Sequence, residues 1–130
     1  MKYLVLIYSN PTSWAHPTFE HTDYYRAASP AERAEMDAQF VELMREISES
    51  GELVSGTPLA PPATTRVICV EDGVTVTTDG PFAESKEQMA GYFVLDCADM
   101  DRATALAARF PDARFGHVEV RPIVDSPPRS

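Results

Sequence analysis

The chain has 130 residues, of which 44% are hydrophobic and 24% are charged. These proportions are typical of one globular domain and exclude disordered and fibrous classes. The formal net charge of -9, with its few basic residues scattered along the chain, disfavours binding to nucleic-acid phosphates and anionic membrane surfaces. We therefore expect a single domain over residues 1–124, a flexible tail over residues 125–130, and no nucleic-acid or membrane partner.

The first apolar run, residues 3–8, predicts a strand that is central in a sheet or covered on both faces. This run is too short for a membrane span or a signal-peptide core, and no cleavage pattern follows it. We therefore expect a cytoplasmic protein. The two cysteines, Cys69 and Cys97, lie in apolar strand-like runs without metal or redox spacing, so we expect reduced thiols packed in the core.

Residues 9–28 form a long connection that is rich in aromatic side chains and has no clear period. We expect a short helical turn within it, with its aromatic side chains packed over the sheet, a pocket or a second subunit.

A helix is predicted to begin after Ser29, because this hydroxyl, Pro30 and Glu32 form the pattern of a capping box. Gly51 predicts its end, since glycine adopts the left-handed conformation of a helix C-terminus. The spacing of apolar residues along the helix predicts one buried stripe. Its members are Met36, Phe40, Leu43, Met44 and Ile47.

The second half of the chain predicts five further strands and one more helix. A strand over residues 52–59 is interrupted at Gly56, and Asp72-Gly73 favours a tight turn between strands 65–70 and 74–78. A strand over residues 92–97, a helix from Asp99 to Pro111 with Ala103, Leu106, Ala107 and Phe110 facing inward, and a strand over residues 116–121 follow.

This order of elements predicts an α+β fold. A ferredoxin-like split βαβ sheet would carry both helices on one face. The other face would be bare and apolar, and such a face usually binds a partner. We therefore expect a homodimer in which two sheets pack face to face as a dimeric α+β barrel.

The most informative stretch is Asp79-Gly80-Pro81-Phe82, which lies between the alternating run of residues 74–78 and the sequence Ala-Glu-Ser-Lys-Glu at residues 83–87. It resembles the signature of the DGPF proteins, a branch of the YCII-related family. The resemblance also covers residues 1–8, 51–56 and 118–122. It implies small ferredoxin-like domains that pair as dimers, with largely unassigned chemistry. DGPF proteins resemble components encoded beside sigma factors of the extracytoplasmic-function type, which implies an association with signalling.

The chain departs from the wider YCII-related group at two positions. Catalytic proposals for that group rest on a histidine in the first helix and an aspartate just before the proline that ends the second helix. Here the helix of residues 30–50 has no histidine, and Phe110 precedes Pro111. The pair therefore cannot be transferred to this chain, and the Asp79 motif is what remains of the family site.

Asp79 is the main candidate for chemistry, because a carboxylate at a strand end beside a Gly-Pro turn can be held rigidly at a cleft. A base that acts near pH 7 needs a raised pKa and hence burial. The alternative is an Asx-turn, in which the carboxylate accepts hydrogen bonds from backbone amides. A third alternative is that residues 79–87 only hold a dimer together.

The other candidates surround this motif or lie in the aromatic connection. Lys86 would stabilise negative charge and could pair with Glu84, and histidines titrate near neutral pH. The catalytic candidates are Asp79, Glu84, Lys86, His16 and His21. The ligand-binding candidates are Tyr8, Trp14, Phe82, Tyr92 and His117. No metal is expected, because the histidine spacing matches no metal signature.

Two functional hypotheses remain. The first is a cofactor-independent acid and base enzyme of isomerase or lyase type, which acts on a small organic molecule. The second is a noncatalytic protein that binds a small ligand or regulates sigma-factor signalling. Hydrolase, kinase and dehydrogenase activities have no support, because the chain lacks a GxSxG elbow, a phosphate-binding loop and a dinucleotide fingerprint.

Overall fold

A computed structural model of the chain describes residues 1–10, 18–81 and 88–124. Its elements follow one another as β1 (Lys2–Ser9), η1 (Phe19–His21), α1 (Asp23–Ala27), α2 (Pro30–Ser50), β2 (Leu53–Pro58), η2 (Pro62–Thr64), β3 (Arg66–Glu71), β4 (Val74–Asp79), β5 (Gln88–Asp96), α3 (Met100–Ala107), η3 (Pro111–Arg114) and β6 (His117–Pro122). The predicted strands and helices are confirmed, although β5 begins four residues earlier than expected and α3 ends before Phe110.

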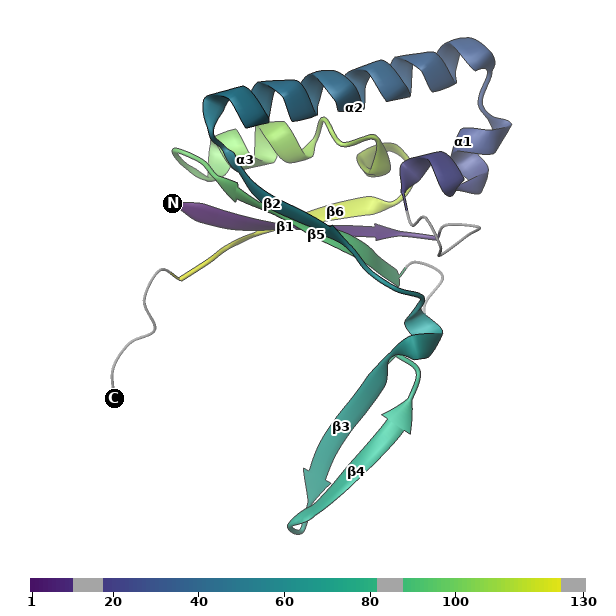
Figure 1. The fold of residues 1–130 in the computed structure, drawn as a ribbon, viewed down its shortest axis with the longest axis vertical. Coiled ribbons are helices and arrows are strands. Elements are labelled where there is room, and N and C mark those ends of the chain that lie inside the picture. The colour runs from purple at the N-terminus through teal and green to yellow at the C-terminus, as the bar shows by residue number, and fades with distance from the viewer. Residues whose placement is uncertain (11–17, 82–87, 125–130) are drawn as a thin grey trace.

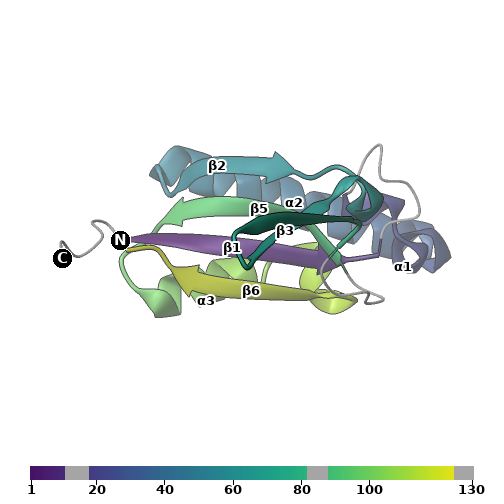
Figure 2. The ribbon, with the colours of Figure 1, turned by 90° about the horizontal axis from the view of Figure 1, so that it is seen from below.

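Four strands form one antiparallel sheet in the order β2-β5-β1-β6. The helices α2 and α3 lie side by side on one face of this sheet, and within residues 1–10, 18–81 and 88–124 no helix covers the opposite face (Figures 1 and 2). The α+β class predicted from the sequence is therefore confirmed. No helix in the described part of the chain has the length and apolar content needed to cross a membrane.

The helix α2 begins and ends where local chemistry predicts. The Ser29 hydroxyl accepts a hydrogen bond from the Glu32 backbone amide, while the Glu32 carboxylate accepts one from the Ser29 amide. Gly51 ends the helix at a φ of 80°, a left-handed conformation that glycine adopts without steric cost. The cap thus determines how the chain turns from α2 into β2.

The core lies between the sheet and the helices. Within the predicted stripe of α2, Met36, Leu43 and Ile47 are buried, while Phe40 is half-buried and packs against them. The other residues of the core cluster come from β1, β5, α3 and the residues that follow β5 and α3: Tyr3, Val5, Ile7, Leu95, Cys97, Ala103, Leu106, Ala107 and Phe110. Cys97 is therefore a core thiol as predicted, whereas Cys69 is exposed, so the expectation that both cysteines are buried is wrong.

The strands β3 and β4 form a separate two-stranded sheet, which we call the arm (residues 66–79). The arm stands away from the four-stranded sheet on the side opposite the helices (Figure 1). This placement explains the exposure of Cys69, because a side chain of the arm has no core beneath it. Asp79 lies at the root of the arm, where it pairs with Arg66.

Candidate functional site

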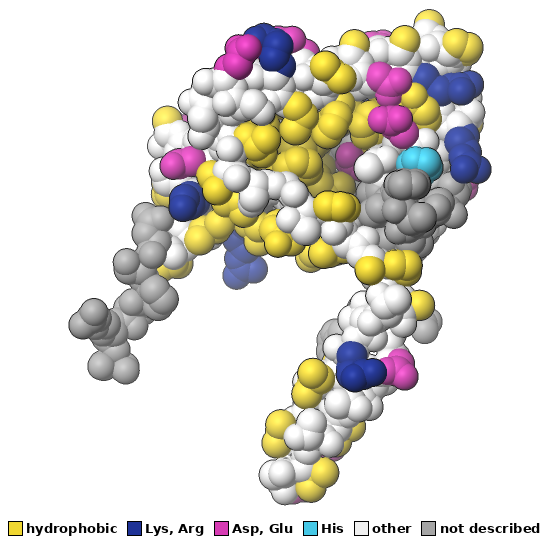
Figure 3. Space-filling view, in the orientation of Figure 1, with side chains coloured by type: hydrophobic (Ala, Val, Ile, Leu, Met, Phe, Trp, Pro, Cys, Tyr) yellow, Lys and Arg dark blue, Asp and Glu magenta, His cyan; other side chains and the backbone are white. Residues whose placement is uncertain are grey.

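A cavity of about 240 Å³ lies between α2 and the strands β2 and β5. Hydrophobic side chains gather in the hollow between α2 and the sheet (Figure 3). Binding sites for small molecules are concave and largely apolar with a few polar groups, as this cavity is. Its lining consists of Ile7, Thr18, Phe19, Glu20, Phe40, Gly56, Thr57, Pro58, Ala90, Gly91, Phe93, Phe110 and Asp112.

Four phenylalanines from four separate segments of the chain form one wall of the cavity. The ring of Phe110 lies 4.9 Å from that of Phe93 and 6.4 Å from that of Phe40, measured between centroids. The ring of Phe19 extends this cluster, since its centroid is 5.4 Å from that of Phe40. All three pairs are inclined and lie in the distance range in which aromatic rings attract each other. The wall is therefore held in shape by contacts among its own members.

Glycines form a second wall, where the main chain itself borders the cavity. A Cβ atom added to Gly56 would lie 2.6 Å from the Phe93 ring, and one added to Gly91 would lie 2.8 Å from the Thr57 carbonyl oxygen. Both distances are far below ordinary contact. The absence of side chains at these two positions lets the Phe93 ring and the backbone of β2 approach each other, which sets the width of the cavity.

Asp112 is the buried ionisable residue of the cavity lining. It is the second residue of η3 and is only 6% exposed, whereas Glu20, the other ionisable lining residue, is exposed. Burial raises the pKa of the Asp112 carboxyl group to about 6, because its charged form loses hydration, and a hydrogen bond from its own backbone amide offsets part of this effect. Both protonation states are thus accessible near neutral pH.

The backbone around Asp112 is fixed by a tight crossing with β1. The Asp112 carbonyl oxygen accepts a hydrogen bond from the Gly116 amide at 2.9 Å. A Cβ atom at Gly116 would lie 2.3 Å from the Tyr8 carbonyl oxygen and 3.4 Å from that of Asp112, so a larger residue there would push β1 and η3 apart. Glycine at this position therefore keeps Asp112 close to the sheet.

Ser9 supplies a second buried polar group near the end of β1. Its hydroxyl oxygen has no hydrogen-bond partner among the residues that the structure describes, and the residue is 1% exposed. Alternate residues of a strand face the same side, so Ser9 follows the cavity-lining Ile7 on the helix-covered face. An unpaired buried hydroxyl normally costs stability, which makes this group available to an additional partner.

Asp79 is not among the described residues that line this cavity, and it lies at the end of β4 on the arm. Its side chain is 87% exposed in the single chain, with one carboxylate oxygen 3.6 Å from Arg66 Nε. The burial that a base at this position requires is therefore absent within one chain. Gly80 follows with a φ of 95°, and its amide donates a hydrogen bond to the Thr65 carbonyl oxygen at 2.7 Å, so it acts as a turn residue.

Three other predicted site residues lie on the open face of the sheet instead of in the cavity. The ring of Tyr8 stacks on that of His117 at 4.6 Å, with an angle of 11° between the ring planes. Tyr92 pairs with Leu6 in the register of β1 and β5. His21 ends η1, next to Glu20 of the cavity lining. None of these four side chains lines the cavity in the described part of the chain.

The remaining predicted site residues lie outside the described residues. They are Trp14, His16, Phe82, Glu84 and Lys86. Because the structure does not describe residues 11–17 and 82–87, the sequence-based hypotheses for these five side chains stay predictions.

Asp112 was missed by reasoning from the sequence alone. The family pattern directs attention to the residue before Pro111, which is Phe110, whereas the buried carboxyl group belongs to the residue after it. Only the apolar Phe110-Pro111 pair beside an acidic residue could have signalled burial. Among 20 acidic residues, that signal is too weak to single out one carboxylate.

Comparisons with known proteins give a family but no assigned chemistry. The sequence profile of the YCII-related domain matches residues 1–127. The chain is also similar to an uncharacterized protein of Rhizobium meliloti (strain 1021), with 36% identity over 83 residues. That alignment covers 62% of this chain and 67% of the relative.

Proposed function

Because the chain belongs to the YCII-related family, whose relative in Rhizobium is itself uncharacterized, we propose a function from the structure of the cavity. The cavity binds a small, largely apolar organic molecule, and Asp112 exchanges a proton with that molecule. The buried Asp112 carboxyl in an otherwise apolar lining is the observation that carries this proposal. The reaction would be a cofactor-independent isomerisation or elimination.

The acidity of Asp112 suits this role. General acid and base catalysis is most efficient when the pKa of the catalytic group lies near the working pH, and burial raises the pKa of Asp112 to about 6. At neutral pH the Asp112 side chain of most protein molecules is then a carboxylate, which can accept a proton. The partly desolvated carboxylate is also a stronger base than an exposed one.

The lining restricts the class of ligand. Four aromatic rings offer broad apolar contact, whereas the polar groups are few and lie at Thr18, Glu20 and Thr57 besides Asp112. A volume of about 240 Å³ is slightly below the range of typical ligand pockets. The favoured substrates are therefore small carbonyl compounds with an acidic C–H bond and an apolar substituent.

A noncatalytic ligand-binding protein is the second candidate. It is favoured by the same apolar lining, which gives contact area without requiring a reactive group. Regulation of sigma-factor signalling rests on the resemblance of the DGPF motif alone. A role for Asp79 in either function requires a second chain that encloses it, because this side chain is 87% exposed in one chain.

Deuterium exchange distinguishes these candidates. A panel of small carbonyl compounds is first screened for binding by thermal shift, and bound compounds are then followed by NMR in D₂O for incorporation of deuterium beside the carbonyl group. We expect the wild type to accelerate the exchange, and Asp112→Asn to bind the compound but to exchange it ~10²- to 10⁴-fold more slowly.

The matched control is Asp79→Asn, which makes the same chemical change at an exposed position and should exchange like the wild type. Equal exchange by Asp112→Asn and the wild type would eliminate Asp112 as the base. Binding without exchange by the wild type would favour the noncatalytic function. Loss of binding in Asp79→Asn alone would move the site to the arm.

We also propose that the protein is a homodimer built on the ferredoxin-like plan. The strand order β2-β5-β1-β6 with two helices on one face supports this plan. The helix-free face carries Leu4, Leu6 and Val94, which are half-buried in the single chain. A second sheet packed on this face would remove them from water, as in a dimeric α+β barrel.

A further inference from the structure

The arm exposes apolar side chains on both of its faces. The register of β3 and β4 places Ile68 and Val70 on one face, and Cys69 and Val76 on the other face together with Val74. Their exposure in the single chain is high: Ile68 63%, Val70 67%, Val74 62% and Val76 40%. Hydrophobic side chains are visible along the arm in Figure 3. The arm therefore has no core of its own.

Such a hairpin needs a covering surface. An isolated two-stranded hairpin is marginally stable in water, and a hydrophobic face packed on another element is required for independent stability. Among the described residues, β3 pairs only with β4, and an unpaired strand edge can bind another chain. The charged residues of the arm lie at its two ends. Arg66 is opposite Asp79 at the end next to the body, and Glu71 lies beside the turn at the other end. The middle of the arm is uncharged, as the centre of a protein interface usually is.

The arm stands beside a second open apolar surface of the same chain. The face of the main sheet that carries no helix displays Leu4, Leu6, Tyr92 and Val94, each half-buried. The arm projects from the body on this side: it lies below the sheet in Figure 1, and it lies in front of β1 when the sheet is viewed from below in Figure 2. A body that covers the open face would therefore lie on the same side of the sheet as the arm.

We propose that the arm is a clasp that packs against the body of a second copy of this chain, an inference that rests on the homodimer proposed above. A two-fold axis places the same patch of both copies in contact, so one operation covers both open faces and both arms. No other occupant is required to account for the two surfaces.

The areas are consistent with a stable dimer. The exposed apolar side chains of the arm offer on the order of 400 Å², which is already the size of the largest patch on many monomers. The open face of the sheet adds further apolar area toward the ~800 Å² that a standard interface buries per partner. The face-to-face contact alone would leave the apolar arm in water.

Lysine substitutions on the arm test the clasp. Ile68→Lys and Val74→Lys change one residue on each face of the arm, at exposures of 63% and 62%, and Val41→Lys on α2 is the matched control at 66%. Sedimentation velocity across the micromolar range gives the dimer dissociation constant. We expect Val41→Lys to dimerise like the wild type, and at least one arm variant to dimerise roughly tenfold or more weakly. Circular dichroism and urea midpoints establish that the variants are folded.

Hydrogen exchange of the wild type provides a measurement that does not depend on folding of the variants. Amides of residues 66–79 should exchange more slowly as the protein concentration rises through the dimer dissociation constant, because the partner covers the arm. Exchange of these amides that does not depend on concentration would overturn the clasp.

The outcomes separate the clasp from the other proposals. A wild-type protein that remains monomeric would refute both the homodimer and the clasp. A stable dimer that tolerates both arm variants would refute the clasp and leave face-to-face pairing intact. Neither result alters the test of the cavity, which depends on Asp112→Asn and on ligand exchange.

Discussion

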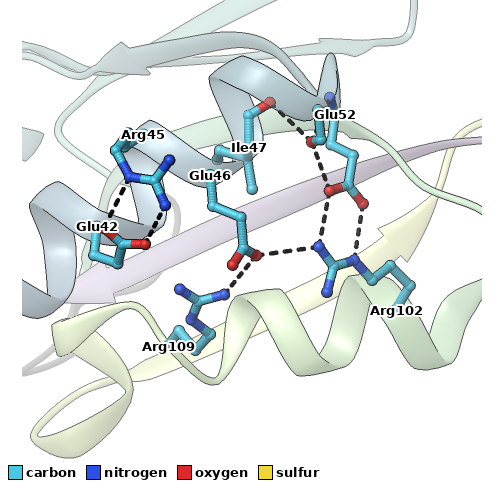
Figure 4. Close-up of polar contacts among 8 residues, drawn as sticks. Glu42, Arg45, Glu46, Ile47, Glu52, Arg102 and Arg109 are labelled. Carbon is cyan, nitrogen blue, oxygen red and sulfur yellow. Dashed lines mark hydrogen bonds and ion pairs between the residues drawn. The ribbon is translucent and has the colours of Figure 1, made fainter.

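Arg102 binds Glu52 through two parallel hydrogen bonds, from Nε to Oε2 and from Nη2 to Oε1, each 2.9 Å long (Figure 4). Arg102 lies in α3, and Glu52 follows the helix cap of α2. Glu46 of α2 joins the same network, with Arg109 at 2.7 Å and Arg102 at 3.2 Å. The network ties the two helices above the sheet and lowers the pKa of Glu52 to about 2, because Arg102 stabilises its charged form.

Arg102→Ala should lower the free energy of unfolding by about 1 to 2 kcal/mol at neutral pH. The cause is that Glu52, whose side chain is only 15% exposed, keeps its charge but loses its main partner. Urea denaturation measures this change. The control is Arg45→Ala, whose ion pairs with Glu42 and Glu49 connect turns of the same exposed helix surface and contribute little. Equal stability of the two variants would show that the ion pairs between α2 and α3 contribute no more to the free energy of unfolding than the exposed pairs of Arg45.

The stability of the protein should depend on pH through Asp112. Burial raises its pKa to about 6 in the folded chain, so the folded chain binds this proton more tightly than the unfolded chain does. The favourable contribution is complete below the unfolded pKa near 4 and is lost as the pH rises through 6. The loss is on the order of 2 to 3 kcal/mol.

Asp112→Asn tests this dependence, because it removes the ionisation with little change of shape. The difference in unfolding free energy, variant minus wild type, should become more positive between pH 4 and pH 7 and then level off. Denaturant titrations at several pH values measure it, with the exposed Asp79→Asn as the control that should follow the wild type. A flat difference across this range would mean that the Asp112 carboxyl group is hydrated in solution.

Gly51→Ala should destabilise the protein by about 1 kcal/mol, because an alanine Cβ atom disfavours the left-handed conformation at a φ of 80°. Nothing lies within 4 Å of the added atom, so the effect would come from the backbone alone. Gly51→Asn should cost less, since asparagine tolerates this conformation. Thermal and urea unfolding of the two variants provide the comparison, and an equal loss in both would point to a cause other than backbone conformation.

Gly56→Ala should lower stability by about 1 to 3 kcal/mol, the usual cost of adding a methyl group to a packed site. The added Cβ atom would lie 2.6 Å from the Phe93 ring, so the ring must move within the cavity. Weaker binding of any cavity ligand should accompany the loss of stability. Ser55→Ala, at an exposed position of the same strand, is the control, and a variant at Gly56 with unchanged binding would show that Phe93 does not shape the ligand site.

The elements with local signals could be predicted from the sequence. The capping box at Ser29 and the left-handed turn at Gly51 define α2 through contacts between near neighbours, and Asp72-Gly73 defines the turn of the arm in the same way, since both residues have positive φ. The direction of the arm could not be predicted, because it depends on how β2 leaves the main sheet. The end of a strand at Asp79 could therefore be predicted, whereas the exposure of its side chain in the single chain could not.

The cavity depended on contacts between residues distant in the sequence. Phe19, Phe40, Phe93 and Phe110 come together only when four segments of the chain pack, and no local pattern states that Asp112 will be enclosed by them. The sequence therefore predicted a buried carboxyl group between sheet and helices, which the structure shows at Asp112. The hypothesis for Asp79, whose side chain is exposed in the single chain, stays a prediction.

The two walls of the cavity differ in how they can be altered. The glycine wall is shaped by main chain, so substitutions at Gly56 and Gly91 can only narrow the space. The phenylalanine wall can be trimmed, and replacement of Phe40 by leucine or alanine would admit bulkier compounds. Redesign of ligand size, or natural divergence among relatives, should therefore proceed through the helix side while the strand side stays constant.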